Sequence, residues 1–257
     1  MKTFKYFTSI LTMFCLTLVV LASCKKEEVK PSIPDQTMYH GDKYNIPVKG
    51  NWTSSNPLIA YVEDDIVEAI TIGNARISNG EISFNVNVNP KYNLYKEPFL
   101  SWGSSPSAIR SFMSSYNISS DKSNMIIYEG RNKELNIAYS FTSSKLSAVG
   151  VFVKCSQVTT SEIVGYLCER YIPVGEINSK QVGLVSNDKK TAILMSVESS
   201  SYGLVYYIFY SPLSNSRSMS NNDDINSQLS EIANTIDCKN LPNEKFEEVK
   251  ELILKSR

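Results

Sequence analysis

The sequence is poor in histidine, with His40 as the single copy in 257 residues. Ser–His and Cys–His catalytic arrangements need a base beside the nucleophile, so this scarcity nearly excludes them. The five cysteines match no zinc-binding spacing, and the sequence has no Gly-rich phosphate loop and no calcium loop. We therefore expect no metal, no cofactor and no catalytic residue, and an enzyme is the weaker hypothesis.

The chain also has no excess of charge, with 26 basic and 26 acidic residues. Two of the basic residues, Lys2 and Lys5, lie in residues 1–23, so the rest of the chain has 24 basic against 26 acidic residues. A near-neutral chain has no electrostatic basis for binding nucleic acid or an anionic membrane surface. Nucleic acid is therefore not an expected partner.

Long apolar runs are absent except at the N-terminus, where residues 6–22 are almost free of charge. A basic start followed by a short apolar run is typical of a secretory signal, and a membrane span needs roughly 20 apolar residues. The run ends in Leu21, Ala22, Ser23 and Cys24, which resemble the lipobox of bacterial lipoproteins. The resemblance implies that residues 1–23 are a signal peptide and that Cys24 is acylated. The alternative is an ordinary signal peptide with a chance cysteine.

A charged cluster follows the cysteine at once: Lys25, Lys26, Glu27 and Glu28. It resembles the short cluster that directs lipoproteins of the Bacteroidota to the outer surface. The resemblance implies a protein anchored in the outer membrane by lipid and exposed at the cell surface. A periplasm-facing orientation is the alternative. Residues 24–36 form the lipidated tether, which can span roughly 40 Å at about 3.1 Å per residue.

Residues 37–91 have the pattern of a β domain. Ile82, Phe84, Val86 and Val88 alternate with polar residues, which predicts a half-buried antiparallel strand. Asn79-Gly80 before them predicts a hairpin turn, because both residue types tolerate a positive φ.

This region resembles the bacterial Ig-like (group 2) domain family. The matching features are a Trp52–Asn56 run, an Ala60–Val62 strand and a Gly73–Ile77 strand. The sequence departs from the family at Glu63-Asp64-Asp65, where a glycine is usual. The resemblance implies an Ig-like β-sandwich that acts as a spacer or adhesion module and is rarely catalytic.

Residues 99–211 have the pattern of an α+β domain. A helix is expected after Ser104-Ser105-Pro106, and a second helix after the capping-box-like start at Thr159, ended by Pro173 and Gly175. The strands expected after the two helices are residues 125–129, 135–141 and 146–154, then 181–186, 191–198 and 204–210. The pattern predicts a duplicated α-β-β-β unit that forms one antiparallel sheet with helices on one face.

Residues 218–257 are expected to form a helical tail. Asp223 or Asp224 can cap a helix with apolar residues at Ile225, Leu229 and Ile232, and Leu241-Pro242 separates it from a last helix. Amphipathic stripes usually face a core, so we expect the tail to pack on the α+β domain, with partner binding as the alternative. The whole chain is then mostly β with α+β.

Three cysteines remain after Cys15 and Cys24: Cys155, Cys168 and Cys238. An odd number leaves at least one unpaired in an exported protein. Free cysteine is usually buried, so we interpret these residues as small apolar core residues.

Aromatic residues are the main candidates for binding. The stretch of residues 201–210, SYGLVYYIFY, is crowded with aromatic rings, and Trp102 lies near the start of the α+β domain. Ring faces that are open to solvent can stack on sugars or receive a protein. The candidate ligand residues are Trp102, Tyr202, Tyr206 and Tyr210. Core packing is the favoured interpretation of the tyrosine-rich strand, and a wedge between domain and linker is the favoured interpretation of Trp102.

The expected function is non-catalytic binding or presentation of a glycan or protein at the bacterial cell surface. An accessory subunit of a periplasmic envelope complex is the second hypothesis. A carboxylate-based glycosidase is the third, with Asp64-Asp65, Glu247-Glu248 and Glu27-Glu28 as the carboxylate pairs, all of which have a solvent-facing pattern.

Overall fold

The computed structural model describes residues 32–213, 222–236 and 243–256. Within these ranges the chain is mostly β-strand with a helical C-terminal tail, which confirms the expected fold class. The predicted signal peptide, Cys24, the charged cluster of residues 25–28, Cys238 and the Leu241-Pro242 break all lie outside the described residues.

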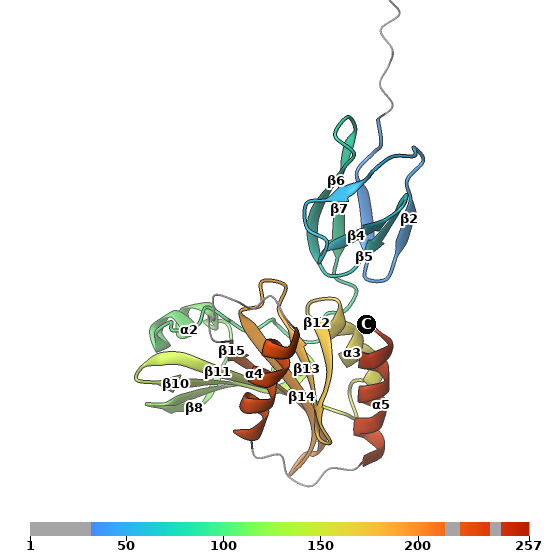
Figure 1. Ribbon diagram of the computed structural model, residues 1–257. Coiled ribbons are helices and arrows are strands. Elements are labelled where there is room, and N and C mark those ends of the chain that lie inside the picture. Colours follow the sequence, from blue (N-terminus) through green and yellow to red (C-terminus); the bar gives the residue numbers. More distant parts are fainter. Residues whose placement is uncertain (1–31, 214–221, 237–242, 257) are drawn as a thin grey trace, which may run out of the picture.

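The first domain contains two small sheets around one core (Figure 1). One sheet has the order β1-β7-β6-β3 and the other β2-β5-β4. The strands are β1 (Gln36–Tyr39), β2 (Lys43–Asn45), β3 (Thr53–Ser54), β4 (Ala60–Glu63), β5 (Ile66–Ala69), β6 (Gly73–Ser78) and β7 (Ser83–Asn89). In β7 the residues Phe84, Val86 and Val88 are buried while Asn85 and Asn87 are exposed, as the alternation predicts.

The hairpin between β6 and β7 is also confirmed. The two strands pair in antiparallel register, and Gly80 in the turn has a φ of 93°. The Asn79 side chain accepts hydrogen bonds from the backbone N–H groups of Glu81 and Ile82, so it stabilises the turn that its position predicts.

The second domain is built on one antiparallel sheet of eight strands. Its elements are α2 (Pro106–Phe112), β8 (Ile118–Lys122), β9 (Met125–Glu129), β10 (Glu134–Thr142), β11 (Lys145–Lys154), α3 (Thr160–Cys168), β12 (Ile172–Asn178), β13 (Gln181–Val185), β14 (Thr191–Ser200) and β15 (Gly203–Pro212). The Ser105 hydroxyl caps α2, and Thr159 and Glu162 form the capping box of α3.

The repeated unit has four strands instead of the three expected from the sequence. The sheet order is β12-β13-β14-β15-β11-β10-β9-β8, so two α-β-β-β-β units meet where β11 pairs with β15. The two missed strands, β8 and β12, are the two edges of the sheet. No residue of β8 is buried, so it shows no apolar alternation. In β12, Pro173 and Gly175 look like helix-ending residues, but an edge strand tolerates proline because one side needs no ladder hydrogen bond.

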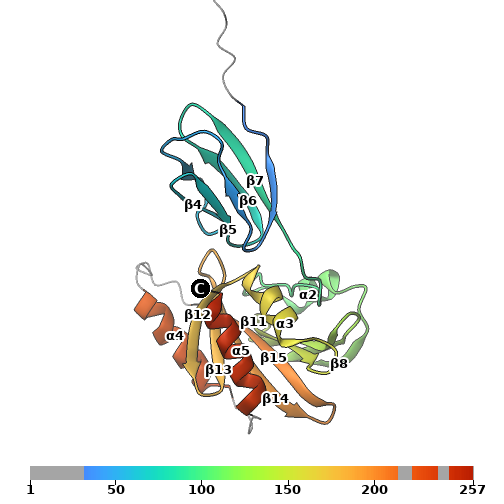
Figure 2. The same ribbon diagram turned by 90° about the vertical axis from the view of Figure 1, so that its right-hand side faces the viewer.

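Helices cover both faces of this sheet, which corrects the prediction of helices on one face. The tail helices are α4 (Asn222–Asn234) and α5 (Asn243–Lys255). α2, α3 and α5 pack on one face, where Ile137, Val151 and Ile208 belong to the main core. α4 packs on the other face, against Val185 and Leu194. In Figure 1 the strands β12 to β14 run between α4 and α5, and Figure 2 shows α3 and α5 side by side.

The two domains are joined through Glu169, the residue that ends α3. Its fully buried carboxylate accepts hydrogen bonds from the backbone N–H groups of Lys91 (2.8 Å) and Tyr92 (3.1 Å), and Arg170 neutralises it. Its backbone carbonyl accepts from Ile72 N of the first domain at 2.7 Å. One residue therefore holds both the linker and the first domain to the C-terminal half of the sheet.

Candidate functional site

Two of the candidate ligand residues are core residues, which agrees with the favoured packing interpretation of their strand and contradicts a binding role for them. Tyr206 and Tyr210 are fully buried on the helix-covered face of β15. The Tyr210 hydroxyl lies 2.8 Å from the Tyr95 hydroxyl, and the Tyr206 hydroxyl lies 3.1 Å from Thr160 Oγ1. Burial raises the pKa of Tyr210 well above its ordinary value, because the phenolate would be poorly solvated. No ligand reaches these rings.

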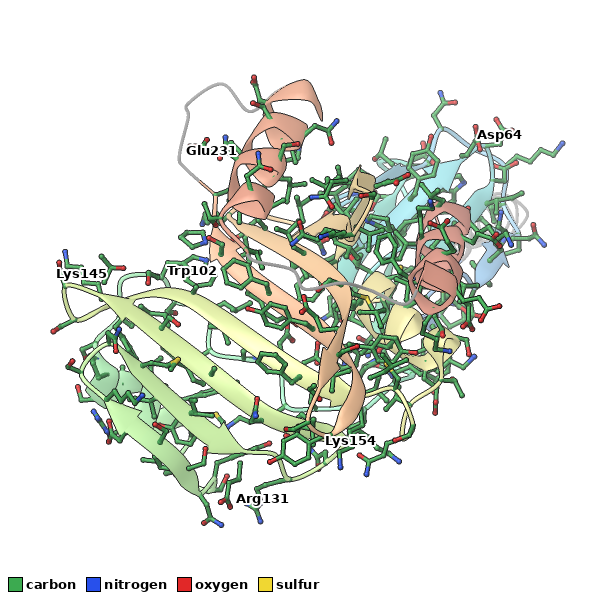
Figure 3. The ribbon with its side chains drawn as sticks, turned by 90° about the horizontal axis from the view of Figure 1, so that it is seen from below. Asp64, Trp102, Arg131, Lys145, Lys154 and Glu231 are labelled. Atoms are coloured by element: carbon green, nitrogen blue, oxygen red, sulfur yellow. The ribbon has the colours of Figure 1, made fainter. Side chains whose placement is uncertain are left out.

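The other two predicted residues lie apart from each other. Trp102 donates from Nε1 to Thr191 Oγ1 (3.1 Å) at the start of β14. Tyr202 lies in the turn that follows the end of β14, and 65% of it is exposed. A strand of ten residues separates the two ends by about 30 Å. Figure 3 shows Trp102 toward the Lys145 end of β11 and away from Lys154 at the other end. The structure therefore provides two surfaces and not one.

The first surface is a groove of about 710 Å³ beside Trp102, which we call the Trp102 groove. It is formed by the segment before α2, the residues after α3, the turn between β13 and β14, and the end of β15. The indole is partly exposed, and its hydrogen bond to Thr191 fixes the direction of the ring plane. The volume of the groove lies within the range of roughly 300–1,000 Å³ that is usual for ligand pockets.

The charged residues of the Trp102 groove balance. Glu97 and Asp188 are acidic, and Arg170 and Lys190 are basic. Arg170 is already paired with Glu169, and Lys190 lies 3.6 Å from Asp188. The groove therefore has hydrogen-bonding side chains without an excess of either charge, which suits a neutral polar ligand better than an ion.

Asp188 acts in the Trp102 groove as a hydrogen-bond acceptor. Partial burial disfavours its charged form, but hydrogen bonds from Ser186 Oγ (2.6 Å) and the Lys190 backbone N–H outweigh this and lower its pKa. A carboxyl group with a lowered pKa is a poor proton donor at neutral pH, so Asp188 is suited to accept hydrogen bonds in the groove.

None of the charged residues of the Trp102 groove was identified from the sequence. Glu97, Arg170 and Asp188 come from three segments that the fold brings together, and none lies in a local motif. The only sequence signal was the tryptophan itself, in an apolar context that also fitted a packing role.

A second cavity, of about 510 Å³, lies at the joint of the two domains. It is lined by His40 and Ile70 from the first domain and by Cys168, Tyr171 and Lys255 from the second. Burial raises the pKa of the Cys168 thiol to about 11, so at neutral pH it is protonated and a weak nucleophile. The Cys168 thiol is thus not an activated nucleophile in this cavity.

The second surface is the face of β8 to β11 that points away from α2, which we call the open face. Met125, Ile127, Ala138 and Phe152 lie on it by strand alternation and are all partly exposed. The Phe152 ring stacks on the Tyr207 ring of β15 at 4.5 Å. Tyr202 lies at one end of this surface, with Lys154 Nζ 5.3 Å from its ring centre.

Residues 32–213, 222–236 and 243–256 contain no group of three or more His, Cys, Asp or Glu side chains placed to hold a metal ion. The same ranges contain no helix with the length and apolar character needed to span a membrane.

Comparisons with protein-family models, curated proteins and solved structures found no match.

Proposed function

We propose that this chain is a lipid-anchored binding protein of the bacterial cell envelope, in which the second domain binds a neutral glycan in the Trp102 groove. The observation that supports the proposal most is the Trp102 groove itself. It combines one oriented, partly exposed indole with acidic and basic side chains in balance. Sugars present an apolar ring face for stacking and hydroxyl groups for polar side chains.

The N-terminal features support the anchoring part of the proposal. Cys24 in its lipobox-like setting is the expected lipid attachment site, and the cluster of residues 25–28 favours the cell surface over the periplasm. The first domain, which resembles bacterial Ig-like domains, then acts as a spacer. In Figure 1 the second domain lies at the far end of the first domain from residue 32, so the spacer holds the groove away from the membrane.

The alternative in which the tail helices bind a partner has less support. The apolar residues of α4 and α5 that would form the binding stripes, among them Leu229, Phe246 and Val249, are already buried against the sheet. The glycosidase hypothesis also has less support, because the carboxyl groups of Asp188 and Glu248 both have lowered pKa values. For Glu248 the main cause is a hydrogen bond from Lys245.

A fluorescence titration tests the glycan proposal. The chain has two tryptophans, so a Trp52→Phe variant of residues 24–257 with Cys24→Ser reports on Trp102 alone. Neutral oligosaccharides are titrated against it after selection on a glycan array. We expect a saturable change in emission, and at least tenfold weaker array binding by Trp102→Ala. Tyr202→Ala, at the other end of β14, is the matched control and should bind as the parent does.

The proposal of a glycan site fails if no neutral glycan changes the Trp102 emission, or if Trp102→Ala binds as well as the parent. The anchoring part has its own test. Protease added to intact cells should remove the protein, and Cys24→Ala should release it from the membrane fraction. Loss of the protein only in lysed cells means that it faces the periplasm.

A further inference from the structure

The eight-stranded sheet consists of two units with the same order of elements. In the described part of the chain, only the second unit is covered on its opposite face by an additional helix, α4. The first unit runs from α2 to β11 and the second from α3 to β15. Both use the same face for the shared core, where Val151 of one unit pairs with Ile208 of the other. α4 follows both units in sequence and packs only on the second. The opposite face of the first unit is the open face.

The covered unit shows what kind of element such a face accepts. Leu229 of α4 is fully buried, and Leu194 in the third strand of the unit is 1% exposed beneath the helix. Leu229 also lies close over Gly183, at 3.1 Å from the place where a Cβ would stand. A glycine and apolar side chains therefore form a shallow seat for one amphipathic helix.

The open face offers a seat of the same kind. In its third strand, Ala138 is partly exposed at the centre of the face, beside Gly150 of the fourth strand, which is buried under the Tyr207 ring. Ile127 and Phe152 flank them and are partly exposed. Among the residues that the structure describes, no helix packs on this seat. The buried Asn136 Oδ1 on the same face has no hydrogen-bond partner within the described ranges.

The charged residues of the open face indicate which kind of helix fits it. Lys122, Lys145 and Lys154 lie on this face by strand register. Of the acidic residues in these four strands, Glu129 lies on the same face, whereas Asp121 and Glu134 pair with core-facing residues and lie on the other. Figure 3 shows Lys145 and Lys154 at opposite ends of β11. Basic residues at both ends of an apolar seat favour an acidic partner, and α4 itself is of this type, since residues 222–236 contain acidic residues and no lysine or arginine.

We propose that the open face of β8 to β11 is a docking site for an acidic amphipathic helix of a partner protein, seated as α4 is seated on the other unit. This surface is distinct from the Trp102 groove, and the proposal does not depend on glycan binding. Apolar contacts at Ile127, Ala138 and Phe152 provide the seat, and Lys145 and Lys154 select for negative charge.

The test uses a synthetic peptide with the sequence of residues 222–236 as the probe. The fluorescein-labelled peptide is titrated against the chain of residues 24–257 with Cys24→Ser, and anisotropy is measured. We expect saturable binding that weakens at least tenfold in Ala138→Glu, which places a charge on the seat. Lys154→Glu should weaken it about threefold at low salt, and less at high salt. Lys49→Glu, an exposed reversal in the first domain, should change nothing. A peptide with Leu229→Asp is the matched control probe.

Three results would overturn the proposal. The first is absence of binding up to the solubility limit of the peptide. The second is equal binding to Ala138→Glu and to the parent, which means that the peptide replaces the chain's own α4. The third is a dimer in sedimentation that Ala138→Glu converts to monomer, because the occupant is then a second copy of this chain. Circular dichroism shows that each variant is folded before it is scored.

Discussion

The C-terminal half of the eight-stranded sheet is covered on both faces, whereas the N-terminal half is covered on one. The C-terminal half contacts α4 on one side and α5 on the other, and it also contacts the first domain through Glu169 and Asn187. The N-terminal half has α2 on one face and a partly exposed opposite face. The two units therefore have the same order of elements but differ in how many other elements pack on them.

The strand sequences account for this difference. All five residues of β13 and the first seven of β14 are buried, as expected of strands packed on both sides. In β10 the buried residues Ile137 and Tyr139 alternate with the partly exposed Asn136, Ala138 and Ser140. Two units with the same order of elements can therefore share one core face, while the opposite face is either a second core or a solvent-exposed surface.

The largest expected effect comes from placing a charge at matched positions in the two halves. Leu194→Lys puts an ammonium group under α4, where nothing pairs with it, and should lower the free energy of unfolding by about 3–5 kcal/mol or prevent folding. Ala138→Lys on the open face should change it by no more than about 0.5 kcal/mol. Urea denaturation followed by circular dichroism measures both. Similar losses for both variants would show that the open face is covered in the folded chain.

Shortening Leu229, which is the fully buried residue of α4, is expected to have the next largest effect. Leu229→Ala deletes a fully buried side chain and leaves a cavity over β13, which should cost about 3 kcal/mol of unfolding free energy. Glu231→Ala, exposed on the same helix, is the matched control and should stay close to the parent. Hydrogen exchange should show faster exchange in α4 and β13 and unchanged exchange in β9 and β10. An equal increase of hydrogen exchange in both halves would contradict the conclusion that α4 stabilises only the C-terminal half.

Weakening the Glu169 contacts between the domains should have a smaller effect on stability than Leu229→Ala. It should have a larger effect on the distances between the domains. Glu169→Ala leaves the backbone N–H groups of Lys91 and Tyr92 without their acceptor, which should cost about 2 kcal/mol. Small-angle X-ray scattering should then show a wider range of distances between the domains. Glu63→Ala, exposed in the first domain, is the control. An unchanged scattering curve for Glu169→Ala would mean that the retained contacts suffice, which are the bond from the Ile72 N–H to the backbone carbonyl of residue 169 and the bond from Asn187 to Thr71.

The smallest effect is expected from ionisation of Cys155 and Cys168. Both thiols contact the core that the two halves of the sheet share. Burial raises the pKa of each thiol to about 11 from an ordinary value near 9. The unfolded chain therefore loses these protons first, so their contribution to stability is present below pH 9 and is lost as the pH rises toward 11. In a Cys24→Ser, Cys238→Ser variant, iodoacetamide labelling should be slow at pH 8 for both thiols and should accelerate with pH. Fast labelling of one thiol at pH 7 would show that its part of the core opens.

Local patterns determined much of this structure from the sequence. The caps at Ser105 and Thr159, the alternation in β7 and the Asn79-Gly80 turn depend on contacts within a few residues, and each was predicted correctly. The buried tail helices also followed from their apolar spacing. In contrast, the polar β8 and the Pro173-containing β12 could not be recognised, since edge strands take their pairing from a neighbour and not from their own pattern.

The sequence by itself determined where most helices and strands form and that two similar units follow each other, because hydrogen bonding and periodicity act over short distances. The packing of the whole chain determines which face of the sheet each helix covers, and it brings Trp102, Glu97 and Asp188 together in one groove. These outcomes depend on pairing between β11 and β15, whose residues lie more than fifty positions apart in the chain. No local pattern specifies such a pairing, which the packing of the whole core selects.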